Sequence, residues 1–202
     1  MRQSIVKSVK NRIFGHGRGW VFSAYNFSDL GSDTGVRTAL SRLQEEKIIR
    51  RVAQGIYDYP KTHEVLGLLS PSIDEIARVY GEKNGAKIQA SGAYAANVLG
   101  LSEQVPGKVV FLTDGPTGKV KIKNLIVSFK KTTVRNMSAA GSREALAIQA
   151  MKFMGQDHID EPMLRKIKKH LQQSTRKEFD KNIQYAPRWI RVFLIELMKD
   201  TL

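Results

Sequence analysis

Apolar residues in the first part of the chain recur at helical spacing and then give way to strand-like runs. Residues 3–14 carry apolar side chains four positions apart, and residues 33–46 form a second stripe of this kind. Residues 48–52 and 56–59 are rich in Ile, Val and Tyr, and the three residues between them end in Gly55. The pattern therefore predicts two amphipathic helices followed by a β-hairpin with a three-residue loop.

A shorter pattern lies between the two predicted helices. Residues 20–22 form an apolar run that favours a strand, and residues 24–30 are expected to form a short helix. Gly31 fits the end of that helix, where a glycine can take a positive φ angle. Helix, short strand, helix, tight turn, helix and hairpin is the element order of a winged helix-turn-helix. The sequence therefore predicts a DNA-binding domain of this type over residues 1–60.

The pattern changes after Pro60. Ser72 and Glu75 form a capping-box signature at the start of a helix predicted within residues 70–85, and a small, apolar helix is expected at residues 91–100. Strands are expected at residues 86–90, 108–115 and 120–132. These elements predict a small α/β domain over residues 61–140.

The remaining sequence is helical in pattern. Four helices are expected: one from about Ser142 to Gly155, one starting at Pro162, one at residues 174–183 and one at residues 186–200. The fold class predicted for the whole chain is thus α+β. It comprises the winged helix-turn-helix, the α/β domain and a C-terminal helical region, residues 141–202, packed on the α/β domain.

The charge of the chain points to an anionic partner. The 202 residues carry a formal net charge of +14, and the sequence pI is about 10.0. The positive charge is spread along the chain, so a basic tail does not explain it. Nucleic acid is the first candidate, although a basic enzyme would account for the charge as well. No apolar run approaches the roughly 20 residues of a membrane span, so a cytoplasmic protein without a membrane partner is expected.

The predicted helix at residues 33–46 carries the first candidate DNA contacts. Its polar face is formed by Thr34, Arg37, Thr38 and Ser41. Arg37 could donate two hydrogen bonds to a guanine edge, and the three hydroxyl groups could contact bases or phosphates. The alternative is an ordinary solvated helix face. The order of the neighbouring elements favours the DNA-binding interpretation.

The predicted hairpin carries the second group of candidates. Arg50, Arg51 and Gln54 flank its tip, where a basic wing can contact the phosphate backbone or enter the minor groove. Charged residues that protect an edge strand from aggregation are the alternative explanation. Double-stranded DNA at an operator or promoter is the predicted partner.

The evidence for an enzymatic function is weaker than the evidence for DNA binding. The chain has no cysteine, which excludes disulfides, thiolate metal sites and a cysteine nucleophile. The four histidines lack metal-ligand spacing. Asp114 precedes Lys121 and Lys123, but the second acid that a metal-dependent nuclease would need is missing. We therefore expect no catalytic residue, metal or cofactor. Two alternatives stay open: a nuclease or nucleotidyl-handling enzyme at residues 61–140, or a regulator that senses a ligand there.

Several sequence segments resemble a known family. "GRGWVF", "ALSRL", "IIRRVAQGIYDYP" and "YAPRWI" are similar to the AbiEi-like antitoxins of bacterial type IV toxin–antitoxin systems, and "MGQDHID" adds to the similarity. The resemblance implies an N-terminal winged helix that binds promoter DNA and represses its own operon. It also implies a nucleotidyltransferase-like toxin as functional partner, with direct contact between the two uncertain. The family's DNA-binding positions correspond to the helix around Arg37 and Arg42 and to the hairpin from Arg50 to Tyr57.

Overall fold

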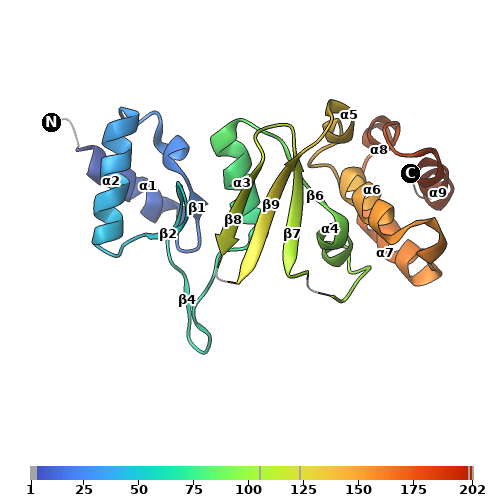
Figure 1. The fold of residues 1–202 in the computed structure, drawn as a ribbon, viewed down its shortest axis with the longest axis horizontal. Coiled ribbons are helices and arrows are strands. Elements are labelled where there is room, and N and C mark those ends of the chain that lie inside the picture. Colours follow the sequence, from blue (N-terminus) through green and yellow to red (C-terminus); the bar gives the residue numbers. More distant parts are fainter. Residues whose placement is uncertain (1–3, 105, 123, 200, 202) are drawn as a thin grey trace. The chain divides into compact units, whose positions relative to one another are not determined.

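The fold is mixed α+β with a C-terminal helical segment (Figure 1). The computed structural model describes residues 4–104, 106–122, 124–199 and 201. Lys123 and the predicted helix limits at residues 3 and 200 lie outside the described residues. Contacts between backbone positions divide the chain after Gly85 into two compact units, which we call the first and second unit. No helix among the described residues has the length and apolar character needed to cross a membrane.

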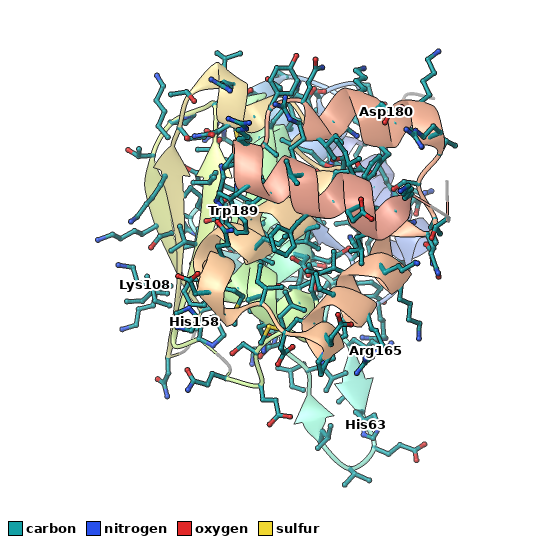
Figure 2. The ribbon with its side chains drawn as sticks, turned by 90° about the vertical axis from the view of Figure 1, so that its right-hand side faces the viewer. His63, Lys108, His158, Arg165, Asp180 and Trp189 are labelled. Atoms are coloured by element: carbon teal, nitrogen blue, oxygen red, sulfur yellow. The ribbon has the colours of Figure 1, made fainter. Side chains whose placement is uncertain are left out.

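The first unit combines three α-helices, a 3-10 helix and short strands. In chain order these are α1 (Ile5–His16), β1 (Val21–Phe22), the 3-10 helix η1 (Ala24–Phe27), α2 (Asp33–Glu45), β2 (Arg50–Ala53), β3 (Ile56–Asp58), β4 (Thr62–His63), β5 (Gly67–Leu68) and α3 (Ile73–Asn84). Strands β1, β3 and β2 form an antiparallel sheet in that order. Strands β4 and β5 form a separate hairpin, whose loop projects from the unit (Figures 1 and 2).

Serine caps start the helices of this unit. The hydroxyl groups of Ser4, Ser32 and Ser72 accept hydrogen bonds from backbone amides in the first turns of α1, α2 and α3, respectively. The apolar stripes of α1 and α2 pack with the aromatic residues between them. The fully or almost fully buried members of this core are Val9, Ile13, Phe22, Phe27, Val36, Ala39, Leu40, Leu43 and Ile49.

Two local predictions are corrected. The segment expected as a helix at residues 24–30 is the four-residue 3-10 helix η1, and Gly31 has no positive φ angle. A Cβ atom at Gly31 would lie 2.7 Å from the Cδ1 atom of Ile5, so this glycine permits close packing. The hairpin loop has two residues, because Ala53 pairs with Ile56. Gly55 in this loop has a φ of 69°, a backbone conformation that glycine adopts without a steric penalty.

The boundary predicted at residue 60 differs from the division in the structure. Helix α3 belongs to the first unit, where Arg78 donates a hydrogen bond to the carbonyl oxygen of Val21 at 3.1 Å. The side chain of Asn26 also donates to the carboxylate of Glu82 at 3.3 Å. These partners lie more than fifty positions apart in the chain, so the local sequence pattern does not reveal them.

The second unit contains a mixed sheet and most of the helices. Its elements are β6 (Ile88–Ser91), α4 (Gly92–Val98), β7 (Lys108–Thr113), β8 (Gly118–Ile122), β9 (Leu125–Lys131), α5 (Val134–Met137), α6 (Arg143–Met154), the 3-10 helix η2 (Gln156–His158), α7 (Glu161–Leu171), α8 (Arg176–Ile183) and α9 (Arg188–Met198). The strand order is β6-β7-β9-β8, in which β7 and β9 are parallel and the other pairs antiparallel. The segment predicted to be a strand at residues 120–132 therefore contains residues of two strands, β8 and β9.

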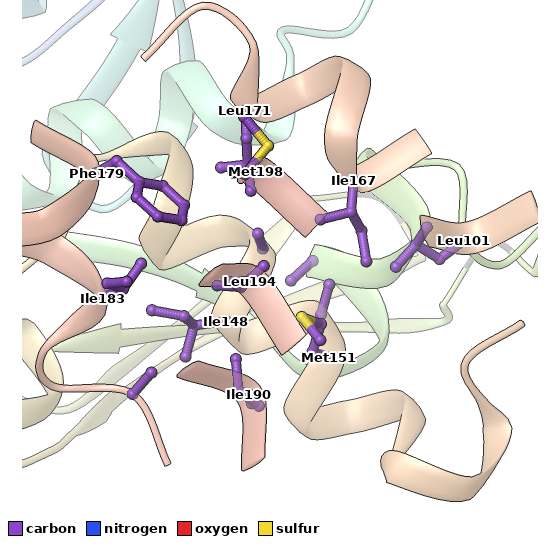
Figure 3. Close-up of a cluster of buried hydrophobic side chains, with 14 of the residues drawn as sticks. Leu101, Ile148, Met151, Ile167, Leu171, Phe179, Ile183, Ile190, Leu194 and Met198 are labelled. Carbon is purple, nitrogen blue, oxygen red and sulfur yellow. The ribbon is translucent and has the colours of Figure 1, made fainter. Parts of the chain in front are cut away.

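One hydrophobic core joins helix α4 to the C-terminal helices (Figure 3). Ala95 and Ala96 of α4 are buried with Ile148 and Met151 of α6 and with Leu194 of α9. The small residues of α4 allow α6 to approach it closely. Helices from both sides of residue 140 therefore share one hydrophobic core.

Candidate nucleic-acid interface

Helix α2 separates its apolar and polar side chains onto opposite faces. Its core-facing positions are Val36, Ala39, Leu40 and Leu43, each at most 1% exposed. Five residues that were predicted to contact DNA are exposed on this helix: Thr34, Arg37, Thr38, Ser41 and Arg42. We call these five residues the α2 face. The helix is therefore anchored by its apolar side and presents hydroxyl and guanidinium groups on its surface.

Within the α2 face, Arg37 forms an ion pair with Asp33. Its Nε atom donates to Oδ2 of Asp33 at 2.7 Å, and both side chains are about 70% exposed. An exposed pair of this kind contributes only about 0–1 kcal/mol, so exchanging it for an interaction with DNA costs little. The bond uses only Nε, and the terminal nitrogens of Arg37 make no hydrogen bond to the described residues.

Two of the three hydroxyl groups of the α2 face have local partners. Thr38 donates to the carbonyl oxygen of Thr34 at 2.9 Å, and Ser41 donates to the carboxylate of Glu45 at 3.3 Å. Each hydroxyl oxygen retains acceptor capacity, so it can accept a hydrogen bond from a base amino group. These bonds also fix the direction of the two side chains relative to the helix.

Two of the three hairpin residues that were predicted to contact DNA are exposed on the β2–β3 hairpin. Arg51 and Gln54 are exposed, and Arg51 makes only a long hydrogen bond of 3.4 Å to the carbonyl oxygen of Ala53. The tip is braced by Lys83 of α3, whose Nζ atom donates to the carbonyl oxygen of Gln54 at 3.2 Å. Sequence reasoning missed this role of Lys83, because it assigned α3 to another domain.

Arg50 differs from its neighbour Arg51. Its guanidinium makes a bidentate ion pair with Asp58 across the hairpin, through Nε at 2.9 Å and through one terminal nitrogen. The same terminal nitrogen donates to the carbonyl oxygen of Leu69 at 2.8 Å. The hydrogen bonds to Asp58 raise the pKa of Arg50. Because the Asp58 side chain is only 3% exposed, Arg50 compensates a buried charge and links the hairpin to the segment after β5.

Arg12 of α1 also has a structural contact. It forms a bidentate pair with Asp29, with two distances of 2.6 Å, and donates to the carbonyl oxygen of Asn26 at 2.8 Å. The hydrogen bonds raise the pKa of Arg12 and lower that of Asp29. Lys7 on the same helix is exposed. Of these two cations, Lys7 is therefore the better candidate for a phosphate contact.

One residue considered for enzymatic chemistry, Asp114, has a backbone partner in the second unit. Asp114 accepts a hydrogen bond from the backbone amide of Lys87 at 2.8 Å. Within the part of the chain that the structure describes, no group of three or more His, Asp or Glu side chains is placed to hold a metal ion.

The first unit thus presents an exposed polar helix face and an exposed hairpin on a compact, mixed α+β scaffold. Residues 7–179 match the model of a family described as being of unknown function, DUF6088, and the chain belongs to this family. The match includes most of both units. No curated protein matches the chain.

Proposed function

We propose that the chain is a sequence-specific DNA-binding transcriptional regulator whose first unit is a winged helix-turn-helix. In this proposal α2 is the recognition helix and the β2–β3 hairpin is the wing. The observation that carries the proposal is the separation of apolar and polar side chains on α2: every buried position is apolar, and the α2 face is exposed. The element order and the β1-β3-β2 sheet support the same assignment.

The chemistry of the exposed groups fits duplex DNA. The major groove is about 12 Å wide and accommodates one α-helix, so α2 can bring Arg37 to a guanine edge and hydroxyl groups to neighbouring bases. Arg42 and Arg51 would contact phosphates, with Arg51 acting from the wing. Arg50 is excluded from this set, because it compensates the buried Asp58.

The biological role proposed is that of an antitoxin that represses its own operon. This part depends on the sequence resemblance to the AbiEi-like antitoxins, which implies a nucleotidyltransferase-like toxin as functional partner. The neighbouring reading frame is the direct check. A nucleotidyltransferase-like gene beside this one supports the role, and its absence from both sides argues against the role while leaving DNA binding intact.

Binding to the DNA upstream of its own gene is expected to be specific and to weaken steeply with salt. Each phosphate contact contributes about −0.9 to the slope of log K against log salt, so three or more contacts give a slope of about −2.7 or steeper. A mobility shift with the upstream duplex and an unrelated duplex of equal length, repeated over a salt series, measures both properties. Equal affinity for the two duplexes would rule out the proposed specificity.

A further inference from the structure

One face of the sheet in the second unit carries a group of exposed lysines. Side chains alternate between the two faces of each strand, and Val109, Phe111, Val127 and Phe129 are buried in the core. By the same alternation the opposite face carries four exposed lysines: Lys108 on β7, Lys119 and Lys121 on β8, and Lys130 on β9. Figure 2 shows Lys108 extending outward from the sheet, away from Trp189 and Arg165.

A concavity of about 520 Å³ lies at this sheet and includes part of the lysine-bearing face. It is lined by Lys108, Thr117, Gly118, Lys119, Ser128, Phe129, Lys130 and Lys131. These residues come from three neighbouring strands and the turn before β8. Its size is within the range of sites for small ligands. No Asp or Glu lies among the described residues that line it, so the concavity is complementary to an anion.

Ser128 lies in this concavity with an unused hydrogen-bonding group. The residue is 2% exposed and is paired between Val110 of β7 and Lys119 of β8. Its Oγ atom has no hydrogen-bond partner among the described residues. A buried hydroxyl without a partner destabilises the fold, and a ligand oxygen that accepts a hydrogen bond from it would remove that cost.

We infer that this concavity binds a small phosphorylated ligand of nucleotide size, whose phosphate oxygens accept hydrogen bonds from the lysine ammonium groups and the Ser128 hydroxyl. An ammonium group has only donors, and so matches phosphate oxygens in both charge and hydrogen bonding. A terminal phosphate group on a small molecule can reach a buried hydroxyl between strands, whereas a phosphate of duplex DNA lies on a broad convex surface. The recessed position of Ser128 therefore favours a free ligand over a nucleic-acid backbone.

Calorimetric titration of the full chain tests the inference, with inorganic tripolyphosphate and ATP as separate probes. Both are expected to bind the wild type, and replacing Lys119 and Lys130 together by alanine is expected to weaken binding by tenfold or more. The matched control replaces Lys177 and Lys181, two exposed lysines of α8, and changes the charge of the same unit equally. Equal loss of affinity in both double variants would show a non-specific charge effect and overturn the inference.

The Ser128→Ala variant separates a ligand-binding role from a structural one. It leaves the net charge unchanged and removes a buried hydroxyl that has no partner, so thermal stability is expected to stay equal or rise. Binding of tripolyphosphate is expected to fall about fivefold or more, because one donor is lost. Wild-type affinity in this variant would overturn the role of Ser128 and with it the inference.

A third titration, with duplex DNA of unrelated sequence, distinguishes the source of the phosphate. If neither small probe binds the wild type and the Lys119/Lys130 variant loses affinity for this duplex, the face contacts nucleic acid and the inference is wrong. The small-molecule titrations contain no DNA, so their outcome does not depend on whether the first unit binds an operator.

Discussion

Replacing Arg37 and Arg51 together by alanine is expected to reduce affinity for the upstream duplex by a hundredfold or more at physiological salt. The change at Arg37 would remove a bidentate contact to a base, which is worth about 1–3 kcal/mol. The change at Arg51 would remove a phosphate contact made by the wing. Both side chains are exposed and neither is part of the hydrophobic core, so the fold should be unchanged. A mobility shift measures the affinity, and circular dichroism checks the fold.

A matched control for this double variant is available in the second unit. Arg165 is exposed and has a weak ion pair with Glu161 four residues earlier, as Arg37 has with Asp33. Arg188 is exposed at the start of α9. Replacing Arg165 and Arg188 by alanine removes the same charge and should change affinity far less. Unchanged binding by the Arg37/Arg51 variant would refute the assignment of the recognition helix and wing.

Replacing Arg50 by alanine is expected to destabilise the first unit by about 3 kcal/mol, whereas Arg51→Ala should change stability by less than about 0.5 kcal/mol. The first substitution leaves the carboxylate of Asp58 buried without its cation and removes the bond to Leu69. We take the lower end of the usual cost for breaking a buried pair, because the Arg50 side chain is 27% exposed. The second substitution removes only an exposed side chain with one long hydrogen bond.

Urea unfolding followed by tryptophan fluorescence can measure this difference in the first unit. The chain has two tryptophans, and a Trp189→Phe background leaves Trp20, which is stacked on His16 with the ring centroids 3.8 Å apart. Asp58→Asn serves as a second variant that changes the other member of the Arg50–Asp58 pair. It keeps the shape of the Asp58 side chain and removes its charge. Equal stability of the Arg50→Ala and Arg51→Ala variants would show that the Arg50–Asp58 pair contributes nothing.

The sequence predicted most helices because their signals are local. The apolar stripes of α1 and α2 and the caps at Ser32 and Ser72 depend on residues three or four positions apart. The same periodicity identified which side of α2 is exposed. The DNA contacts proposed for that side remain a prediction, because exposure alone does not identify a partner.

The features that sequence reasoning missed depend on distant partners. The contact between Arg78 and Val21 that attaches α3 to the first unit leaves no local periodicity. The same is true of the parallel pairing of β7 with β9.

The Arg50–Asp58 pair, in contrast, did leave a signal in the sequence. Opposite charges stand at two positions that face each other across the predicted hairpin, and such pairs commonly stabilise adjacent strands. This signal distinguishes Arg50 from Arg51 without coordinates.

The absence of cysteine from the chain permits the most direct test of the proposed DNA interface. A single cysteine placed at Gln44, which is exposed one turn beyond Ser41 on α2, can carry an iron chelate that cleaves nearby DNA. A second variant with its cysteine at Gln173, exposed after α7, is the control. The account predicts localised cleavage of the upstream duplex from position 44 and none from position 173. If both variants bind the duplex and cleavage occurs only from position 173, the account is contradicted.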